Sequence, residues 1–380
     1  MMSPDNMANV VSADSLRNQM TGKERLEAAL KLEEVDRIPW APKVFIGHYR
    51  SGTTPEHQKM SIAEFADVLN CDAIAWDTLV KTAVTNVTHE TVKEGSVTRR
   101  ITQTPVGEIV STSTWSPETH SSHPSEFPLK GPRDYEVAKY IAEHTTFESD
   151  IGTHEEMLKS VGDRGIVITT GPGTPLMSMI QSMAGMPQVY YHLSDYQEEF
   201  DELFEVESDN WRRYYEALAE TDAEYVCTQE NTSTTLVSPA LYERYCLPLK
   251  KRAREIVKGA GKHYMLHMCG CLKGLLPHIR QIGADSWESF TPPPIGDTYF
   301  KDGREAAGDG VCLIGGMNAL TVSAWPHERV LDYVDETVDS LPHTRGIVFT
   351  SGGAMPLECP TQRLAALGGK LVPHLKNVKN

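Results

Sequence analysis

A histidine and a cysteine two residues apart form the strongest chemical signal in the sequence. The short apolar run 262–267 ends at His267, and Met268, Cys269 and Gly270 follow it. In an extended chain, side chains two residues apart point the same way, so an imidazole nitrogen and a thiolate can face one ion. This pair suits Zn²⁺, which binds such ligands at about 2.0–2.3 Å. The alternative is a buried histidine and a small apolar cysteine at a strand end.

Two acidic residues lie at the ends of the apolar runs that precede and follow the run 262–267. Glu230 follows the run 224–228, and Glu288 ends the run 284–288 and precedes a loop stiffened by three prolines. Adjacent strands lie about 4.8 Å apart, so Glu230 could reach an ion or substrate beside His267. We predict that Glu230 and Glu288 are catalytic and that Asn231 contacts substrate. A strand-end carboxylate that faces water is the alternative.

Four further residues are weaker candidates. Asp77 ends the second apolar run, Tyr49 follows the first, and Met317 lies just after a glycine pair, so each could contact substrate. Each of these residue types is more often a packing or solvated residue. Cys359 is the only other cysteine near the eighth run, and it is therefore the natural third thiolate for a metal.

Eight short apolar runs, rich in valine and isoleucine, must position these residues. They alternate with stretches of helical spacing, which predicts a parallel α/β sheet. The runs are 37–45, 72–76, 165–169, 224–228, 262–267, 284–288, 311–314 and 346–350. Eight units favour a closed (β/α)₈ TIM barrel over an open doubly wound sheet, because no G-x-G-x-x-G fingerprint follows any run. In such a barrel the reacting groups lie at the carboxyl ends of the strands.

One interval, residues 79–163, is too long for a single connection between strands. It contains the segments 90–100 and 101–114, which predict a β-hairpin, and a Ser/His/Pro-rich loop at 116–132. We expect an insertion after the second strand that caps one mouth of the barrel.

The beginning of the chain predicts a tail and then a capped helix. Residues 1–20 are polar and without an apolar stretch, so we expect a flexible tail. Thr21 and Glu24 form a capping-box pattern at the start of a helix over residues 22–31. We therefore expect one barrel domain over residues 21–380.

The charge balance and the cysteines narrow the class of protein. The 380 residues include 36 Lys and Arg against 52 Asp and Glu, a net charge of −16, which disfavours nucleic-acid binding. The apolar runs fall far short of the roughly 20 residues that span a membrane. Seven cysteines without a secretion signal indicate a reducing cytoplasm.

Several motifs in a fixed order carry a resemblance to a known family. The sequence resembles the uroporphyrinogen decarboxylase superfamily and, within it, the zinc-dependent methyltransferases that work with corrinoid proteins. The resemblance extends over nearly the whole chain after residue 20. The motifs are Lys23-Glu-Arg-Leu-Glu-Ala-Ala-Leu, Asp36-Arg-Ile-Pro39, Thr104-Pro-Val-Gly107, Leu236-Val-Ser-Pro239, His267-Met-Cys-Gly270, Gly283-Ala-Asp285 and Gly315-Gly-Met-Asn318.

The resemblance implies a (β/α)₈ barrel with its active site at the carboxyl ends of the strands. His267 and Cys269 match the first two zinc ligands of the methyltransferase branch. The position of its third ligand, a cysteine, is Ala354 here, which leaves Cys359 or Glu230 as substitutes. Glu288 lies near a carboxylate that coordinates in some members.

The resemblance also implies a reaction. We expect a zinc methyltransferase that moves a methyl group between a small molecule (a methyl ether, methanol, a methylamine, or a thiol or pterin acceptor) and the cobalt of a separate corrinoid protein. The corrinoid is expected on a partner because the chain has no D-x-H-x-x-G stretch. The first alternative is a uroporphyrinogen-type decarboxylase, in which Asp77 would match a pyrrole-binding aspartate. The second is a non-catalytic partner of a corrinoid protein.

Overall fold

The chain folds around a parallel sheet that curls into a barrel. The structure, a computed structural model, describes residues 20–46, 49–118, 121–150 and 152–371. The expected tail lies outside the described residues except for Met20. Seven parallel strands follow one another in chain order around the sheet. They are β1 (Ala73–Asp77), β8 (Gly165–Gly171), β9 (Tyr225–Glu230), β10 (His263–Met268), β11 (Ser286–Phe290), β12 (Cys312–Asn318) and β13 (Ile347–Gly352).

A short segment around Trp40 completes the barrel between β13 and β1. The Ala41 amide donates to the Phe349 carbonyl at 2.9 Å, and the Trp40 carbonyl accepts from the Asp72 amide at 2.7 Å. The predicted (β/α)₈ class is confirmed, but the predicted first strand, 37–45, is wrong because it forms only a single bridge at Trp40. Prolines at positions 39 and 42 carry no amide hydrogen, so this segment cannot extend a regular ladder.

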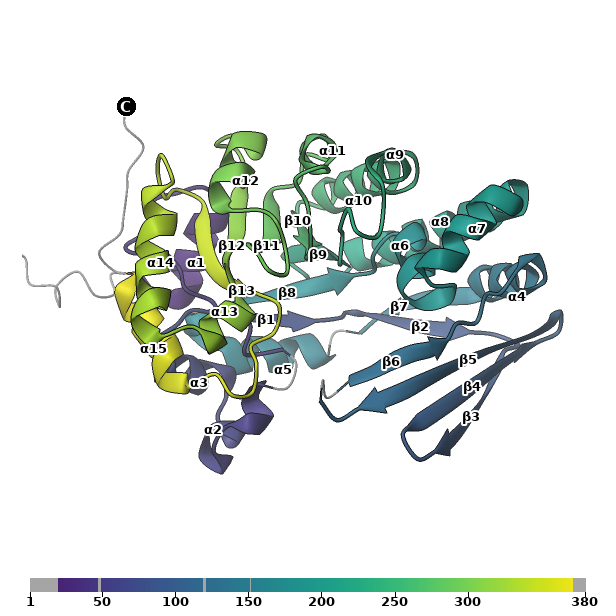
Figure 1. Ribbon diagram of the computed structural model, residues 1–380, viewed down its shortest axis with the longest axis horizontal. Coiled ribbons are helices and arrows are strands. Elements are labelled where there is room, and N and C mark those ends of the chain that lie inside the picture. The colour runs from purple at the N-terminus through teal and green to yellow at the C-terminus, as the bar shows by residue number, and fades with distance from the viewer. Residues whose placement is uncertain (1–19, 47–48, 119–120, 151, 372–380) are drawn as a thin grey trace, which may run out of the picture.

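Helices cover the outside of the sheet (Figure 1). The longer helices are α1 (Gly22–Leu30), α3 (Ile62–Val68), α5 (Gly152–Val161), α7 (Met186–Asp195), α8 (Gln197–Ala219), α10 (Leu247–Gly259), α12 (Phe300–Ala307), α14 (His327–Asp339) and α15 (Thr361–Lys370). Shorter turns are η1 (Tyr49–Gly52), α2 (Pro55–Lys59), η2 (Gly162–Arg164), α6 (Pro175–Ser178), η3 (Met179–Met183), α9 (Pro239–Leu241), η4 (Tyr242–Cys246), α11 (Leu276–Arg280) and α13 (Ala319–Ala324). The predicted capping box of Thr21 and Glu24 is present at the start of α1. Within the described residues, no helix has the length and apolar character needed to cross a bilayer.

The insertion leaves the barrel at the carboxyl end of β1. Strand β2 (Val80–Val84) pairs antiparallel with β7 (Thr145–Ser149), and α4 (Pro132–Glu143) precedes β7. The chain between β2 and α4 forms a separate four-stranded antiparallel sheet. Its strands are β3 (Thr88–Glu94), β4 (Val97–Thr104), β5 (Gly107–Ser116) and β6 (Ser121–Glu126). In Figure 1 the β8 arrow points toward the side where the insertion lies, so the insertion borders the mouth of the barrel.

The predicted hairpin is part of a larger sheet. The segment 90–100 contains the turn between β3 and β4, and the predicted loop 116–132 contains β6. Among the described strands, β6 pairs only with β5 and forms the edge of the sheet, where an amide hydrogen is dispensable, so Pro124 fits there.

The side chains of the strands alternate between two cores. Ile74, Ile168, Cys227, Met265 and Ile314 pack inside the barrel. The strand residues that alternate with these inward-facing ones point toward the helices and join a much larger apolar cluster. This alternation decides which strand-end residues can meet at the mouth.

Candidate active site at the barrel mouth

His267 and Glu288 meet on the inner face of the barrel. They are register partners on the paired strands β10 and β11, so their side chains point to the same face of the sheet. Their sequence neighbours Leu266 and Trp287 point to the other face, into the outer core. His267 Nδ1 and Glu288 Oε2 are joined by a hydrogen bond. Both side chains are buried. The structure therefore brings together two residues that the sequence singles out.

Lys43 binds the other oxygen of the same carboxylate. Its ammonium lies 2.7 Å from Glu288 Oε1 and donates to Ser289 Oγ at 3.2 Å. The lysine comes from the segment that closes the barrel, and its backbone amide donates to Ser351 Oγ at 3.1 Å. Sequence reasoning missed Lys43 because it does not end a strand. A signal existed, since a lysine inside an apolar stretch has to find a partner when buried.

Cys269 lies beside this group and is partly exposed. Its Sγ is 2.9 Å from Ser289 Oγ. Ser289 adopts a left-handed backbone conformation with φ of 72° at a bulge between β11 and β12. A bulge re-aims a side chain, and here it places a hydroxyl between the thiol and Lys43. A molecule entering from the mouth could reach the thiol.

The charges of these four groups shift one another's pKa values. Burial alone would raise the pKa of Glu288, but Lys43 and His267 lower it to about 2. Burial would lower the pKa values of Lys43 and His267, but the Glu288 carboxylate outweighs that effect and raises both. Burial would also raise the pKa of Cys269, yet a hydrogen bond from His267 and the charges of His267 and Lys43 lower it to about 7. Near neutral pH the centre therefore holds a reactive thiol next to a proton donor.

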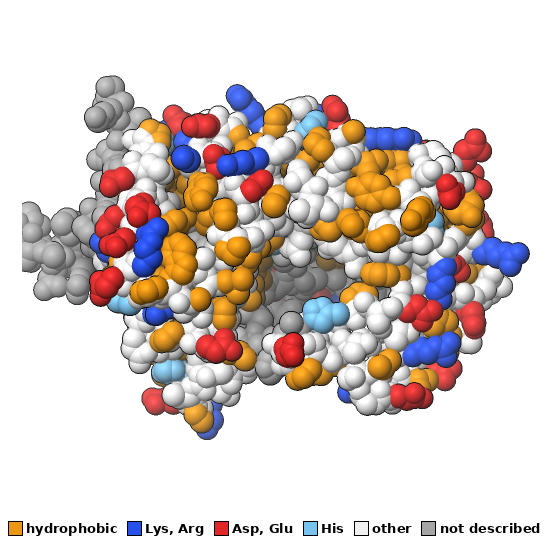
Figure 2. All heavy atoms as spheres, in the orientation of Figure 1, with side chains coloured by type: hydrophobic (Ala, Val, Ile, Leu, Met, Phe, Trp, Pro, Cys, Tyr) orange, Lys and Arg blue, Asp and Glu red, His pale blue; other side chains and the backbone are white. Residues whose placement is uncertain are grey.

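Asn231 completes the group on the solvent side. Its Oδ1 lies 3.3 Å from His267 Nε2, and its side chain is exposed at the end of β9. The predicted substrate contact thus lies next to the predicted metal ligand. Figure 2 shows that the face of the molecule between the barrel and the insertion is hollowed, with hydrophobic side chains along its edges.

Comparison with known proteins decides the family. The profile of the uroporphyrinogen decarboxylase (URO-D) family matches residues 153–369, which is more than half of the chain. The chain belongs to the uroporphyrinogen decarboxylase family. This confirms the resemblance seen in the sequence. No curated protein matches the chain.

The chain also shows similarity to solved structures. A methyltransferase from Methanosarcina mazei is 14% identical, with a TM-score of 0.59 over 93% of this chain and 98% of that one. A 3-keto-D-glucoside 4-epimerase from E. coli is 9% identical, with a TM-score of 0.36 over 66% of this chain and 96% of that one. At these identities the first similarity supports the barrel fold of this URO-D family member.

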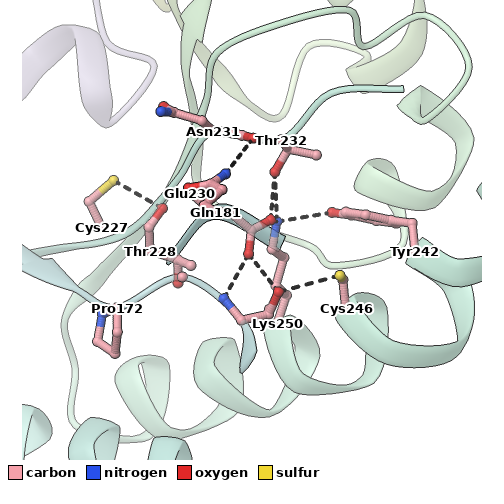
Figure 3. A network of polar contacts seen from close by, with 12 residues as sticks. Pro172, Gln181, Cys227, Thr228, Glu230, Asn231, Thr232, Tyr242, Cys246 and Lys250 are labelled. Carbon is pink, nitrogen blue, oxygen red and sulfur yellow. Dashed lines mark hydrogen bonds and ion pairs between the residues drawn. The ribbon is translucent and has the colours of Figure 1, made fainter. Parts of the chain in front are cut away.

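Glu230 lies on the opposite face of the sheet from His267. Its carboxylate points toward the helices, where one oxygen accepts from Lys250 Nζ and Thr232 Oγ1, each at 2.6 Å. The other oxygen accepts from the Thr174 amide at 2.7 Å and from its hydroxyl at 2.6 Å. Figure 3 shows this closed network, with Tyr242 and Cys246 at its edge. The prediction that Glu230 is a catalytic or metal-binding residue is therefore wrong, because both oxygens are engaged in a buried structural ion pair.

Two predicted substrate contacts also face the helices and not the mouth. Asp77 accepts hydrogen bonds from His154 Nδ1 at 2.6 Å and from Thr169 Oγ1 at 2.8 Å, on the outer side of β1 and β8. Met317 is buried in the large apolar cluster between the sheet and the helices. The error has one cause for both: a position near a strand end does not fix the direction of the side chain.

Tyr49 and Cys359 contact each other on the helix side of the sheet. The Tyr49 hydroxyl donates to the Cys359 carbonyl at 2.8 Å, and both side chains are buried in the outer apolar core. Burial raises the pKa of the Cys359 thiol to about 11. Tyr49 is thus a packing residue, and the assignment of Cys359 as third thiolate is corrected.

The residues fit a metal ion only in part. His267 and Cys269 form the expected nitrogen and sulfur pair. In the part of the chain that the structure describes, no three His, Cys, Asp or Glu side chains converge as a metal site. The nearby Glu288 carboxylate is held by His267 and Lys43. The complete three-residue ligand set expected from the sequence is therefore not assembled.

Proposed function

We propose that this URO-D family member is a methyltransferase that moves a methyl group between a small molecule and the corrinoid of a separate protein. The observation that carries the proposal is the centre of Lys43, Glu288, His267 and Cys269 at the barrel mouth. The similarity in fold to a methyltransferase, over nearly the full length of both chains, supports it.

The residues of the centre suit the proton transfer that this reaction requires. When a methyl group leaves an oxygen or nitrogen of the donor, that atom keeps the bonding electron pair and takes up a proton. His267 can donate this proton from Nε2 on the solvent side, next to Asn231. Glu288 stabilises the imidazolium, and Lys43 holds Glu288 in place. The same imidazole could accept a proton from a thiol in the opposite direction.

Zinc on His267 and Cys269 stays part of the proposal. When bound there, it would supply a Lewis acid that polarises a methyl ether or lowers the pKa of a thiol acceptor. The described chain offers two ligands for the ion and not three. A metal ligand and a proton donor are competing roles for His267, and the metal content of the protein distinguishes them.

A methyl-exchange assay tests the proposal. The purified protein is incubated with free cob(I)alamin and methanol, a methoxylated aromatic or a methylamine, and methylcobalamin is followed by absorbance. The reverse reaction uses methylcobalamin and a thiol. We expect exchange that is lost in His267→Ala and Cys269→Ser and kept in Glu255→Gln, an exposed control on α10. Absence of exchange in both directions with every donor contradicts the proposal. Zinc is measured in the same three variants and in the wild type.

Two other functions have distinct outcomes. The family name favours a decarboxylase. However, Asp77 binds His154 outside the barrel, so the substrate contact expected of a decarboxylase is missing. Conversion of uroporphyrinogen to coproporphyrinogen would establish it. A non-catalytic partner would bind a corrinoid protein equally well after loss of His267 and Cys269, and would turn over no methyl donor.

A further inference from the structure

A cavity of about 330 Å³ lies between the small sheet β2–β7 and the long helix α8, outside the barrel wall. Its volume is at the lower end of the range of about 300–1,000 Å³ for small-molecule sites. Its walls include Phe147 from β7, Met183 from η3, and Glu207, Asn210, Trp211 and Tyr214 from α8. The proposed function does not use any of these residues.

The aromatic side of the cavity is held in place by defined contacts. Trp211 Nε1 donates to the carbonyls of Pro172 at 3.1 Å and of Gly173 at 2.8 Å, in the loop that follows β8. Phe147 and Tyr214 pack edge to face, with ring centroids 5.3 Å apart. Three rings are thus fixed around one space without a ligand having to order them.

Among the described residues that form the wall of this cavity, Glu207 is the only acidic or basic one. It is partly buried, and burial raises the pKa of its carboxyl to about 7, opposed only by a hydrogen bond from Asn210. Among the described residues, no lysine, arginine or histidine forms an ion pair with it. The free-energy cost of burying the Glu207 carboxylate is only partly compensated, because no cation offsets its loss of hydration.

A neighbouring arginine on the same helix makes its contacts with other groups. Arg213 donates to the carbonyls of Thr145 at 2.7 Å and Ala142 at 2.8 Å, and to Asn210 Oδ1 at 3.0 Å. Its guanidinium lies over the Phe147 ring, 5.7 Å from the centroid. Arg213 therefore fixes Asn210 and Phe147 without pairing with Glu207.

We propose that this cavity binds a small organic cation of the methylated-ammonium class, with its charge at Glu207 and its methyl groups against Trp211, Tyr214 and Phe147. Aromatic faces attract cations, and rings around a quaternary ammonium are an established means of recognition. The carboxylate gains the cationic partner that the described residues do not supply. A neutral molecule of the same shape would gain only apolar contact.

The proposed cation site is separate from the centre at the mouth. Helix α8 packs on the outer side of the sheet, whereas His267 faces the barrel interior. The inference therefore does not depend on the proposed methyl transfer, and the two can fail independently.

Isothermal titration of the full chain with tetramethylammonium chloride tests the proposal, with tert-butanol as the neutral ligand of similar shape and sodium chloride as the ionic control. We expect saturable binding that Glu207→Gln weakens by about tenfold or more, because it removes the charge and keeps the shape. Tyr214→Leu should also weaken it. Glu205→Gln, exposed on the same helix, should leave it unchanged.

His267→Ala distinguishes this cavity from the active site and should bind like the wild type. Circular dichroism of each variant checks that it is folded. Three results would overturn the proposal: no saturable binding to the wild type, equal binding of tert-butanol, or binding lost in His267→Ala and kept in Glu207→Gln.

Discussion

The ammonium of Lys43 lies 2.7 Å from Glu288 Oε1, while the other oxygen of this carboxylate bonds to His267. One buried carboxylate thus connects the segment that closes the barrel to β10. The positive charges of Lys43 and His267 also lower the pKa of the Cys269 thiol. Stability and reactivity at the mouth should therefore change together.

Replacing Lys43 by methionine should destabilise the protein strongly. The change leaves Glu288 buried without its main counter-charge, and removing one partner of a buried ion pair costs about 3–5 kcal/mol. Urea unfolding of the wild type and Lys43→Met measures the difference. Lys159→Met is the control, because that lysine is 78% exposed in a surface pair that should contribute under about 1 kcal/mol. If the two variants lost the same free energy of unfolding, Lys43 and Glu288 would not form a stabilising buried ion pair.

Cys269 should be the most reactive thiol near neutral pH. Its pKa of about 7 lies below the ordinary thiol value of about 8.5, so half of it is thiolate at neutrality. We expect the rate of alkylation by iodoacetamide to have a midpoint near pH 7 that is absent in Cys269→Ser. His267→Gln should move the midpoint to higher pH, since it removes the main stabilising hydrogen bond. A wild-type midpoint above pH 8.5 would refute the assigned environment.

Sequence reasoning found the barrel because its strands carry a local signal. Seven of the eight apolar runs are strands, and the eighth fails at Trp40 because the adjacent prolines remove ladder donors. The insertion was located by its length, but β6 was missed because its Ser, His and Pro residues have low strand propensity and form a strand only by pairing with β5.

The centre was predictable only in part, for a reason of geometry. His267, Cys269, Glu288 and Asn231 were found from position at strand ends. Whether a strand-end residue faces inward depends on the register between strands, which one sequence does not contain. Glu230 was therefore assigned to the wrong face. Lys43 reaches Glu288 across 245 positions of chain, so no local pattern could pair them.

Glu230 and Glu288 should differ in what their loss affects. Glu230→Gln should lower the free energy of unfolding by about 3 kcal/mol or more, because Lys250 is then left buried and unpaired. The folded fraction should keep the methyl-exchange rate of the wild type. Glu288→Gln should lower that rate by about 10²-fold or more, the usual scale for loss of an assisted proton transfer. A rate loss in folded Glu230→Gln would restore its catalytic assignment.

The acid stability of the protein should depend on Glu288. The pKa of Glu288 falls from the ordinary 4.5 to about 2 on folding. The ionised carboxylate therefore adds to the free energy of unfolding, and this contribution is complete at pH values above the unfolded-state pKa of 4.5. That shift corresponds to about 3 kcal/mol at neutral pH, which is lost as the pH falls from about 4.5 toward 2. Between about pH 5 and pH 3 the wild type should therefore lose more stability than the double variant His267→Gln/Glu288→Gln, which has neither the carboxylate nor the imidazole to titrate. Parallel curves for the two proteins, measured by urea unfolding at each pH, would mean that Lys43 and His267 do not hold Glu288 ionised.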